Sequence, residues 1–243
     1  MNKMLAMAIL AAAGTTAAGD WPLVVIRHTG GINDNPKVFE RLMESHLRHR
    51  GACDEFWFAG GGRSTPERLA AEAAKIAAFR PLCEKAGMLL SYQQGMTLGH
   101  GALHDGTSKP DEQVFPDDAW QVDRYGKRMG ILCPRAPEAL EYERMYAKTI
   151  IGVAKPASYW LDDDLRLGIS HAEGCFCQRC LDAFNKKTGG SWTRETLVGK
   201  LFSKTVREPV RAAWIAFNSE SLALFAAEAR RAADELGSDC RLA

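Results

Sequence analysis

Residues 159–164 read YWLDDD, and the cysteine-rich run CFCQRC follows at residues 175–180. The first half of YWLDDD is aromatic and aliphatic, which predicts a buried strand that ends in three carboxylates. Carboxylates at the exit of a parallel strand are where many barrel enzymes hold their general acid and base. The three cysteines that follow predict a metal-binding loop beside this strand end.

The composition describes an ordinary globular chain. It has 243 residues, of which 46% are hydrophobic and 25% charged, enough for one large domain or two small ones. The formal net charge of +1 offers no electrostatic reason to bind nucleic acid or an anionic membrane surface. Beyond the first residues, no apolar run approaches the length of a membrane span. We therefore expect no nucleic-acid partner and no membrane span, while a homo-oligomer is compatible with the sequence.

The start of the chain predicts a secretory signal peptide over residues 1–19. Lys3 supplies a positive n-region, residues 4–13 form an apolar h-region, and residues 16–18 resemble a small-residue cleavage pattern. The alternative is an alanine-rich helix packed under the domain. A signal peptide predicts a periplasmic or extracellular location and leaves residues 20–243 as the folded domain.

Apolar runs and helical periodicity alternate along most of the chain. Continuous β-rich runs predict strands, and segments with apolar residues three or four apart predict helices. The predicted strands are 23–26, 56–59, 88–92 and 159–161, and the predicted helices between them are 36–50, 65–86 and 137–154. Such a β-α-β-α order with short links predicts a parallel sheet with right-handed crossovers.

A long insertion, residues 96–137, interrupts this alternation. It is rich in Gly, Asp, His and Pro, so we expect it to be irregular. Insertions of this kind after a strand often build a binding site. The alternative is a plain surface loop. After the cysteines, helices are predicted over 180–187, 195–202 and 208–236. Residues 240–242 would then open a fifth strand.

Together these features predict an α/β fold of the TIM-barrel-like (β/α) type, with four to five βα units. An eight-fold barrel usually needs about 250 residues. Here the insertions use up the length before half of the strands are formed, so we expect a partial barrel over residues 20–243, truncated at its C-terminus. The alternative is a complete open α/β sheet of five strands. Open sheets of this kind often bind a nucleotide, but the sequence has no Gly-x-Gly-x-x-Gly or phosphate-loop fingerprint to mark such a site.

Four segments carry a more specific pattern: DRYGKR at 123–128 with CPRAP at 133–137, WLDDD at 160–164, CFCQRC at 175–180 followed by Phe184, and the helix around Trp214 and Phe217. In this order they resemble the β-galactosidases of glycoside hydrolase family 42, in clan A. In that family strand four ends in Asp-Asn-Glu, and the cysteines read Cys-x-Cys-x-x-Cys-x-x-x-Phe. The close match covers under half of the chain. The resemblance implies a barrel that cleaves glycosidic bonds in an oligo- or polysaccharide.

The resemblance also implies a zinc site at Cys133, Cys175, Cys177 and Cys180. In that family four cysteines bind one zinc near the active-site face. Cys133 precedes Cys175 by forty-two residues, which is close to the family's spacing. Four thiolates form a closed tetrahedral site, so this zinc would be structural. The alternative is free or disulfide-bonded cysteines, although seven clustered cysteines make a full disulfide framework a poor explanation.

By the same resemblance Asp164 falls on the family's acid/base glutamate, Asp163 on its asparagine and Asp162 on its aspartate. Asp164 is thus the candidate general acid, and Asp163 is its catalytic neighbour in substrate binding. Aspartate is one methylene shorter than glutamate, which would widen the gap from the roughly 5 to 5.5 Å of a retaining enzyme. Adjacent carboxylates raise one another's pKa, which suits a general acid. The alternatives are a solvated strand end and a calcium-like oxygen site.

Polar and aromatic residues at the predicted strand exits are candidates for contacts with a carbohydrate substrate. They are Arg27, His28, Gln93, Asp162 and Trp160, with Arg63, Gln94 and Trp120 as weaker ones. In related barrels the nucleophile is a glutamate at the end of strand seven, which would lie beyond residue 243. We therefore expect hydrolysis only if a C-terminal half completes the barrel. A non-catalytic carbohydrate-binding or degenerate relative is the alternative, and the neutral charge disfavours a zinc module on nucleic acid.

Overall fold

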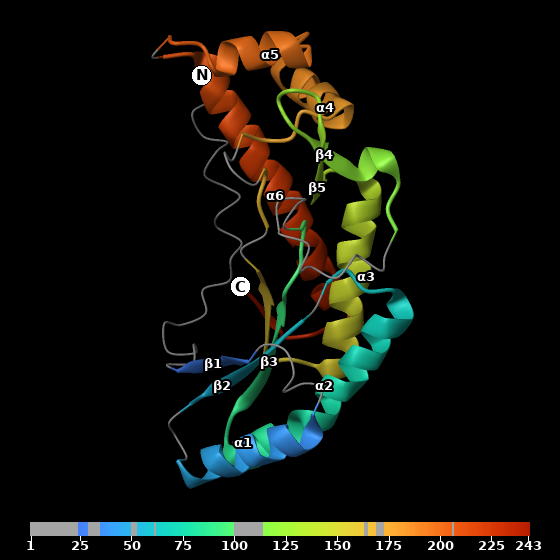
Figure 1. The fold of residues 1–243 in the computed structure, drawn as a ribbon, viewed down its shortest axis with the longest axis vertical. Helices are drawn as coiled ribbons and strands as arrows, with labels where there is room; N and C mark the ends of the chain where they lie inside the picture. The colour runs from blue at the N-terminus through green and yellow to red at the C-terminus, as the bar shows by residue number, and fades with distance from the viewer. Residues whose placement is uncertain are drawn as a thin grey trace.

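The computed structural model describes residues 24–28, 35–49, 53–60, 62–99, 114–162, 165–168, 173–205 and 207–243. The predicted signal peptide lies outside these residues. The described chain is built around one five-stranded parallel sheet, with helices packed along it (Figure 1). The predicted α/β class with a parallel sheet is therefore confirmed.

The strands of this sheet stand side by side in their order along the chain, β1-β2-β3-β6-β7, and all neighbours are parallel. A doubly wound sheet would reverse its strand order at a switch point, whereas (β/α) barrels add each strand to the same edge. Their bounds are β1 Val25–His28, β2 Glu55–Ala59, β3 Leu89–Gln94, β6 Ser158–Leu161 and β7 Arg241–Leu242.

Four helices make the crossovers, and each begins with proline at its first helical position. Proline suits this position because its fixed φ is already helical and its missing N–H would have no partner there. The helices are α1 Pro36–Arg48, α2 Pro66–Ala86, α3 Pro137–Ala154 and α6 Pro209–Glu235. They pack in sequence, α1 on α2, α2 on α3 and α3 on α6, and so form one layer against the sheet (Figure 1).

Alternate strand residues fill the space between the sheet and this layer. The ring of Phe58 on β2 lies 5.4 Å from Phe39 of α1 and 5.5 Å from Phe79 of α2, measured between centroids. On β3, the Tyr92 hydroxyl lies 2.6 Å from the hydroxyl of Tyr146 on α3. Because side chains alternate along a strand, the residues between these core positions face the other side of the sheet.

That other face of the sheet is concave. Trp57 of β2 and Trp160 of β6 have β3 between them, a separation of about 10 Å in a flat sheet, yet their ring centroids are 4.0 Å apart. Glu55 of β2 and Arg241 of β7 are three strands apart, about 14 Å in a flat sheet, and their charged groups are 3.1 Å apart. Two such contacts across the same face indicate that the sheet curls toward it.

Glu55 is the centre of these cross-sheet contacts. Its side chain is fully buried, and its carboxylate accepts hydrogen bonds from the indole Nε1 of Trp57 at 3.0 Å and of Trp160 at 3.4 Å, besides pairing with Arg241. A buried charge is tolerated only where donors replace the lost water. Glu55 therefore ties β2 to β6 and to β7, which has only two residues.

The insertion after β3 is more ordered than the sequence predicts. It holds a 3-10 turn over Asp117–Ala119 and an antiparallel hairpin of β4 Trp120–Val122 and β5 Arg128–Leu132. Gly126 takes the left-handed conformation, φ +87°, that the turn between these strands requires. The expectation of an irregular segment is wrong for this part, because strands this short leave little periodicity in the sequence.

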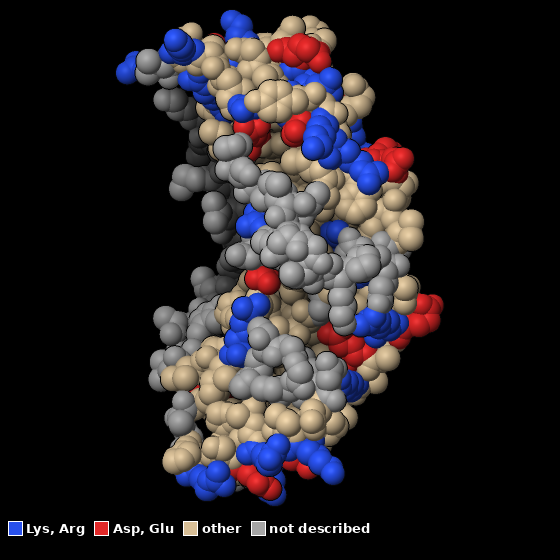
Figure 2. All heavy atoms as spheres, viewed as in Figure 1, with Lys and Arg blue, Asp and Glu red and all other residues tan. Residues whose placement is uncertain are grey.

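The hairpin lies with α4, Gln178–Thr188, and α5, Arg194–Leu201, at one end of the molecule (Figure 1). This is the end where α3 and α6 begin, so the carboxyl ends of the strands point toward it. On the face in Figure 2, basic and acidic side chains are interspersed among uncharged ones.

Among the described residues, no helix combines the length and the apolar character that a membrane crossing needs.

We expect Glu55→Ala to lower the free energy of unfolding by about 3 to 5 kcal/mol, because it removes the acceptor of a buried ion pair and of two indole N–H groups. Urea denaturation followed by circular dichroism would measure it. Glu44→Ala, an exposed position on α1, is the matched control and should change stability by less than about 0.5 kcal/mol. A loss of under about 1 kcal/mol for Glu55→Ala would contradict the role given to this carboxylate.

Candidate functional site

The four predicted zinc ligands meet in one buried cluster. Cys133 follows β5, Cys175 and Cys177 lie in the loop after β6, and Cys180 is in the first turn of α4. Their sulfur atoms all lie within 4.8 Å of one another. The Sγ of Cys133 is 3.7 Å from that of Cys177 and 3.5 Å from that of Cys180.

These separations fit a metal better than a disulfide. A Zn–S bond of about 2.3 Å gives a tetrahedral edge of about 3.8 Å, close to the separations found, whereas bonded sulfurs lie about 2.05 Å apart. All four side chains are buried, which suits a closed site with no open position. The cluster could therefore hold one metal ion.

The electrostatics of the cluster favour a thiolate at Cys177. Hydrogen bonds from the thiols of Cys133, Cys175 and Cys180 hold the pKa of Cys177 far below its ordinary value. Cys177 is also the N-cap of α4, where the helix dipole stabilises negative charge. Burial instead raises the pKa of Cys175. Since thiolates are the form that binds metals, Cys177 is prepared as a ligand.

Two contacts dock the cysteine loop and the start of α4 onto the β4–β5 hairpin and the 3-10 turn before it. The N–H of Phe176 donates to the carbonyl of Val122 at 2.8 Å. The guanidinium of Arg179 donates to the backbone carbonyl of Asp118 at 2.9 Å and to its carboxylate at 3.0 Å. The hairpin and the loop after β6 therefore form one substructure, with the thiol cluster at their junction.

An aromatic cluster fixes this loop to α6. The ring of Trp214 stacks on Phe176 and meets Phe184 edge-on, each at 5.0 Å between centroids. The Trp214 indole N–H donates to the carbonyl of Glu173 at 2.7 Å. Gly174 adopts φ +102°, and a Cβ there would lie 2.8 Å from the indole nitrogen, so only glycine allows this approach.

The second part of the candidate site is the carboxyl edge of the concave face. Arg27 of β1 lies 3.7 Å from the carboxylate of Asp162, the residue after β6, again across three strands. Gln93 of β3 is next to Trp160 in the sheet register. The structure thus places four predicted substrate residues, Arg27, Gln93, Trp160 and Asp162, on one face. The fifth, His28, ends β1, and its side chain lies outside the described residues.

The predicted catalytic residues Asp163 and Asp164 also lie outside the described residues. The structure describes the positions on both sides of them. The N–H of Leu165 donates to the carbonyl of Asp162 at 3.2 Å, which holds the two ends of this segment together directly after β6.

Trp57 and Glu55 belong to this face and escaped the sequence prediction. Trp57 packs against the ring of Trp160, whose N–H bonds to Glu55, so Trp160 acts within an aromatic pair and not as a lone stacking platform. The signal was available in the β2 sequence EFWFA. Its alternation puts Glu55 and Trp57 on the face opposite Phe56 and Phe58.

Three weaker candidates do not join the concave face. Arg63 is buried, donates to the carbonyl of Leu98 at 2.7 Å and stacks over the ring of Trp120. Gln94 points into the helical layer, where its amide donates to the Glu143 carboxylate at 2.8 Å. Packing within the insertion and beneath α3 uses these side chains, so they lie away from the predicted substrate residues on the concave face.

The fold is similar to that of two solved enzymes, a β-galactosidase and a β-amylase. The chain is similar to a β-galactosidase from the psychrophilic Marinomonas ef1, with a TM-score of 0.54 and 14% identity over 90% of this chain and 36% of that one. It is also similar to the catalytic domain of a β-amylase from Paenibacillus polymyxa, with a TM-score of 0.53 and 10% identity over 89% of this chain and 65% of that one. The chain thus spans less than two thirds of either structure. No family model matches the sequence, and no curated protein does.

We expect the protein to bind one divalent ion through the thiol cluster. Cobalt(II) should give the absorption bands of a tetrahedral thiolate site, and Cys177→Ser should weaken binding by more than about 100-fold, since even indirect partners of a metal can cost that much. Cys53→Ser is the control, a buried cysteine outside the cluster whose thiol donates to the Glu55 carbonyl at 3.2 Å. Equal cobalt binding by wild type and Cys177→Ser would contradict the assignment.

Proposed function

We propose that residues 20–243 form a partial (β/α) barrel, of four to five βα units, that hydrolyses glycosidic bonds in an oligo- or polysaccharide where a C-terminal half completes it. One observation carries this proposal: Arg27, Gln93, Trp160 and Asp162 share the concave face at the carboxyl ends of parallel strands. That edge is where (β/α) barrels hold their substrates. The consecutive strand order and the curl of the sheet support the partial barrel. The fold likeness to a β-galactosidase and a β-amylase supports a sugar substrate by analogy.

In this proposal Asp164 is the general acid. It donates a proton to the glycosidic oxygen as the C–O bond breaks. A water molecule then adds to the anomeric carbon and gives its proton to a second carboxylate of the completed barrel. Asp163 binds substrate beside it. The Arg27 guanidinium lies 3.7 Å from the Asp162 carboxylate, so an ion pair stands two residues before the proposed acid.

Gln93 is suited to hold a sugar hydroxyl. Its side chain is only 6% exposed, and its amide oxygen has no hydrogen-bond partner among the described residues. A buried acceptor without a donor costs free energy, and a substrate hydroxyl would remove that cost. The Trp57–Trp160 pair next to it offers an apolar surface for the C–H face of the ring.

In finer detail, we propose a relative of glycoside hydrolase family 42 with zinc as the native ion of the four cysteines. Zinc has no redox chemistry and accepts a closed tetrahedron of thiolates, so its role is structural. It fastens the β4–β5 hairpin to the loop after β6. The metal content of protein purified without chelator tests the identity of the ion, and a metal other than zinc would overturn it.

A second candidate function is non-catalytic carbohydrate binding by a degenerate barrel. The sequence feature that favours it is aspartate at 164, where the resembling family has glutamate, because the shorter side chain retracts the proton donor. Both candidates bind sugar on the same face. They differ in whether the bound chain is cleaved.

We also propose that residues 1–19 direct export to the periplasm or the outside of a bacterial cell. The exported protein should begin near Asp20, because the small residues before it suit signal peptidase. N-terminal sequencing of the secreted or periplasmic fraction would show this. A cytoplasmic product that retains residues 1–19 would contradict export.

We expect Asp164→Asn to lower kcat on responsive chromogenic glycosides by about 10²- to 10⁴-fold, the usual contribution of a general acid. The measurement compares the full-length native protein with its variant over a panel of aryl glycosides and oligosaccharides. Asp182→Asn, an exposed carboxylate on α4, is the matched control and should keep full activity. Unchanged turnover in Asp164→Asn would remove this residue from the acid role. Sugar binding without any turnover in wild type would favour the second candidate.

A further inference from the structure

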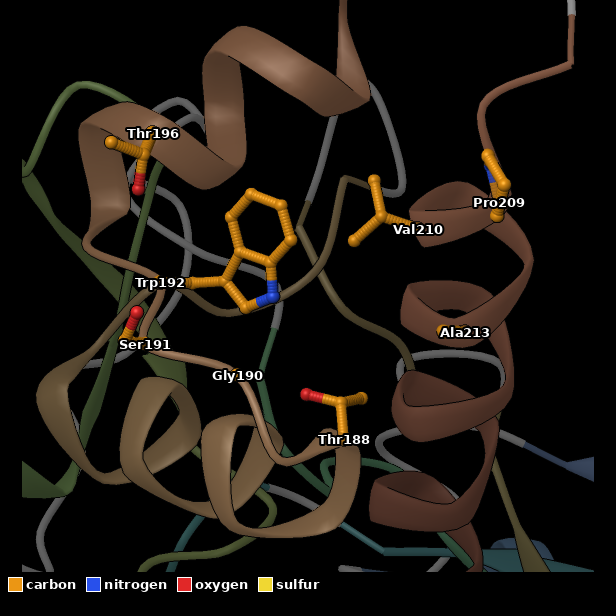
Figure 3. A pocket seen from close by; sticks show the side chains of 8 residues that line it. All are labelled: Thr188, Gly190, Ser191, Trp192, Thr196, Pro209, Val210 and Ala213. Atoms are coloured by element: carbon orange, nitrogen blue, oxygen red, sulfur yellow. The ribbon is translucent and has the colours of Figure 1, made fainter.

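A cavity of about 590 Å³ lies apart from both the thiol cluster and the concave face. It opens between the C-terminal end of α4, the segment that leads into α5 and the first turns of α6 (Figure 3). Small-molecule sites usually measure about 300 to 1,000 Å³, so the cavity has room for a ligand of several rings. It belongs to the end of the molecule toward which the strands' carboxyl ends point.

The aromatic wall of this cavity is Trp192, and its position is fixed on two sides. The Asn185 side chain accepts a hydrogen bond from the backbone N–H of Trp192 at 2.7 Å and donates one to the backbone carbonyl of the same residue at 2.9 Å. The ring also lies directly over Gly190, where a Cβ would come within 2.7 Å of the indole. Because the backbone of Trp192 is anchored and its ring rests against Gly190, the residue loses little conformational entropy when a ligand stacks on it.

Polar groups stand around this ring. Figure 3 shows the Trp192 indole nitrogen and the Thr188 hydroxyl turned toward the interior of the cavity. Unlike its backbone N–H, the indole N–H of Trp192 has no acceptor in the part of the chain that the structure describes. Thr188 donates its hydroxyl proton to the Phe184 carbonyl at 2.8 Å, so its lone pairs can accept from a ligand. The site therefore offers a donor and an acceptor beside one aromatic face.

The remaining wall is apolar and carries no charge. Val210 and Ala213 of α6 face Trp192 across the cavity. Ser191 adds one hydroxyl to the lining. All residues that line the cavity are uncharged. Without a cation the cavity offers nothing to balance a phosphate or carboxylate. A neutral ligand with one apolar face and many hydroxyls fits this wall, and a pyranose ring has that chemistry.

We propose that this cavity is a second sugar-binding site, which holds a neutral polysaccharide at a distance from the bond to be cleaved. Trp192 stacks on the C–H face of one sugar ring, and its indole N–H and the Thr188 hydroxyl bind that sugar's hydroxyls. The choice of sugar as ligand rests on the proposed function, whereas the binding itself requires no catalysis.

Affinity electrophoresis of the full-length protein in gels that contain soluble galactan or starch tests this site. At least one of these neutral polymers should retard wild type, and Trp192→Ala should weaken the retardation by about tenfold or more, since an aromatic anchor is worth more than about 1.4 kcal/mol. Thr188→Val leaves Trp192 in place and should give an intermediate loss. Tyr125→Ala, an exposed aromatic residue in the β4–β5 turn, is the control and should migrate like wild type.

The outcomes separate this site from the hydrolase proposal. Three results would overturn the second site. Wild type and Trp192→Ala could be retarded equally, or neither neutral polymer could retard the protein. The third is retardation only by an added charged polymer, such as polygalacturonate. Hydrolysis that depends on Asp164 would still stand in those cases. Retardation through Trp192 in a protein without turnover supports the second site and contradicts the hydrolase. Unchanged melting temperatures of both variants confirm that the fold is intact.

Discussion

A buried carboxylate on the concave face of the sheet, Glu55, sets the shape of the molecule. It joins β2, β6 and β7 through two indole N–H groups and the Arg241 guanidinium. A charge in this position is costly unless every donor stays in place. The strands can keep these donors together only while the sheet is curled, so electrostatics and curvature stabilise each other. β7, which has only two residues, is joined to the sheet by this contact as well as by its backbone hydrogen bonds.

The curl separates two chemistries on the two faces of the sheet. Aromatic and aliphatic residues such as Phe58 pack into the helical layer and supply the apolar burial that stabilises the domain. Polar and indole side chains line the other face and converge at the carboxyl edge, where Arg27 meets Asp162. The thiol cluster lies outside the sheet, at the junction of the hairpin with α4, where it organises the loops.

Local patterns predicted much of the fold and part of the site. Helix α3 has the predicted bounds, Pro137 to Ala154, because a proline start and strong periodicity mark both ends. The cysteine cluster was predictable because resemblance linked Cys133 to the later three. Contacts that depend on the curvature of the sheet were not predictable. Glu55 and Arg241 are 186 residues apart, and no local pattern in the sequence pairs them. The sequence grouped Gln94 with Gln93 at the same strand exit, whereas the alternation of side chains along β3 puts the two on opposite faces.

The stacked indoles of Trp57 and Trp160 have a further consequence. At 4.0 Å between centroids, their excited states couple, and the coupling depends steeply on separation and tilt. These rings come from strands that touch only through the curl of the sheet. Their joint near-ultraviolet signal is therefore an intrinsic gauge of sheet curvature, and it reports on the concave face without any added label.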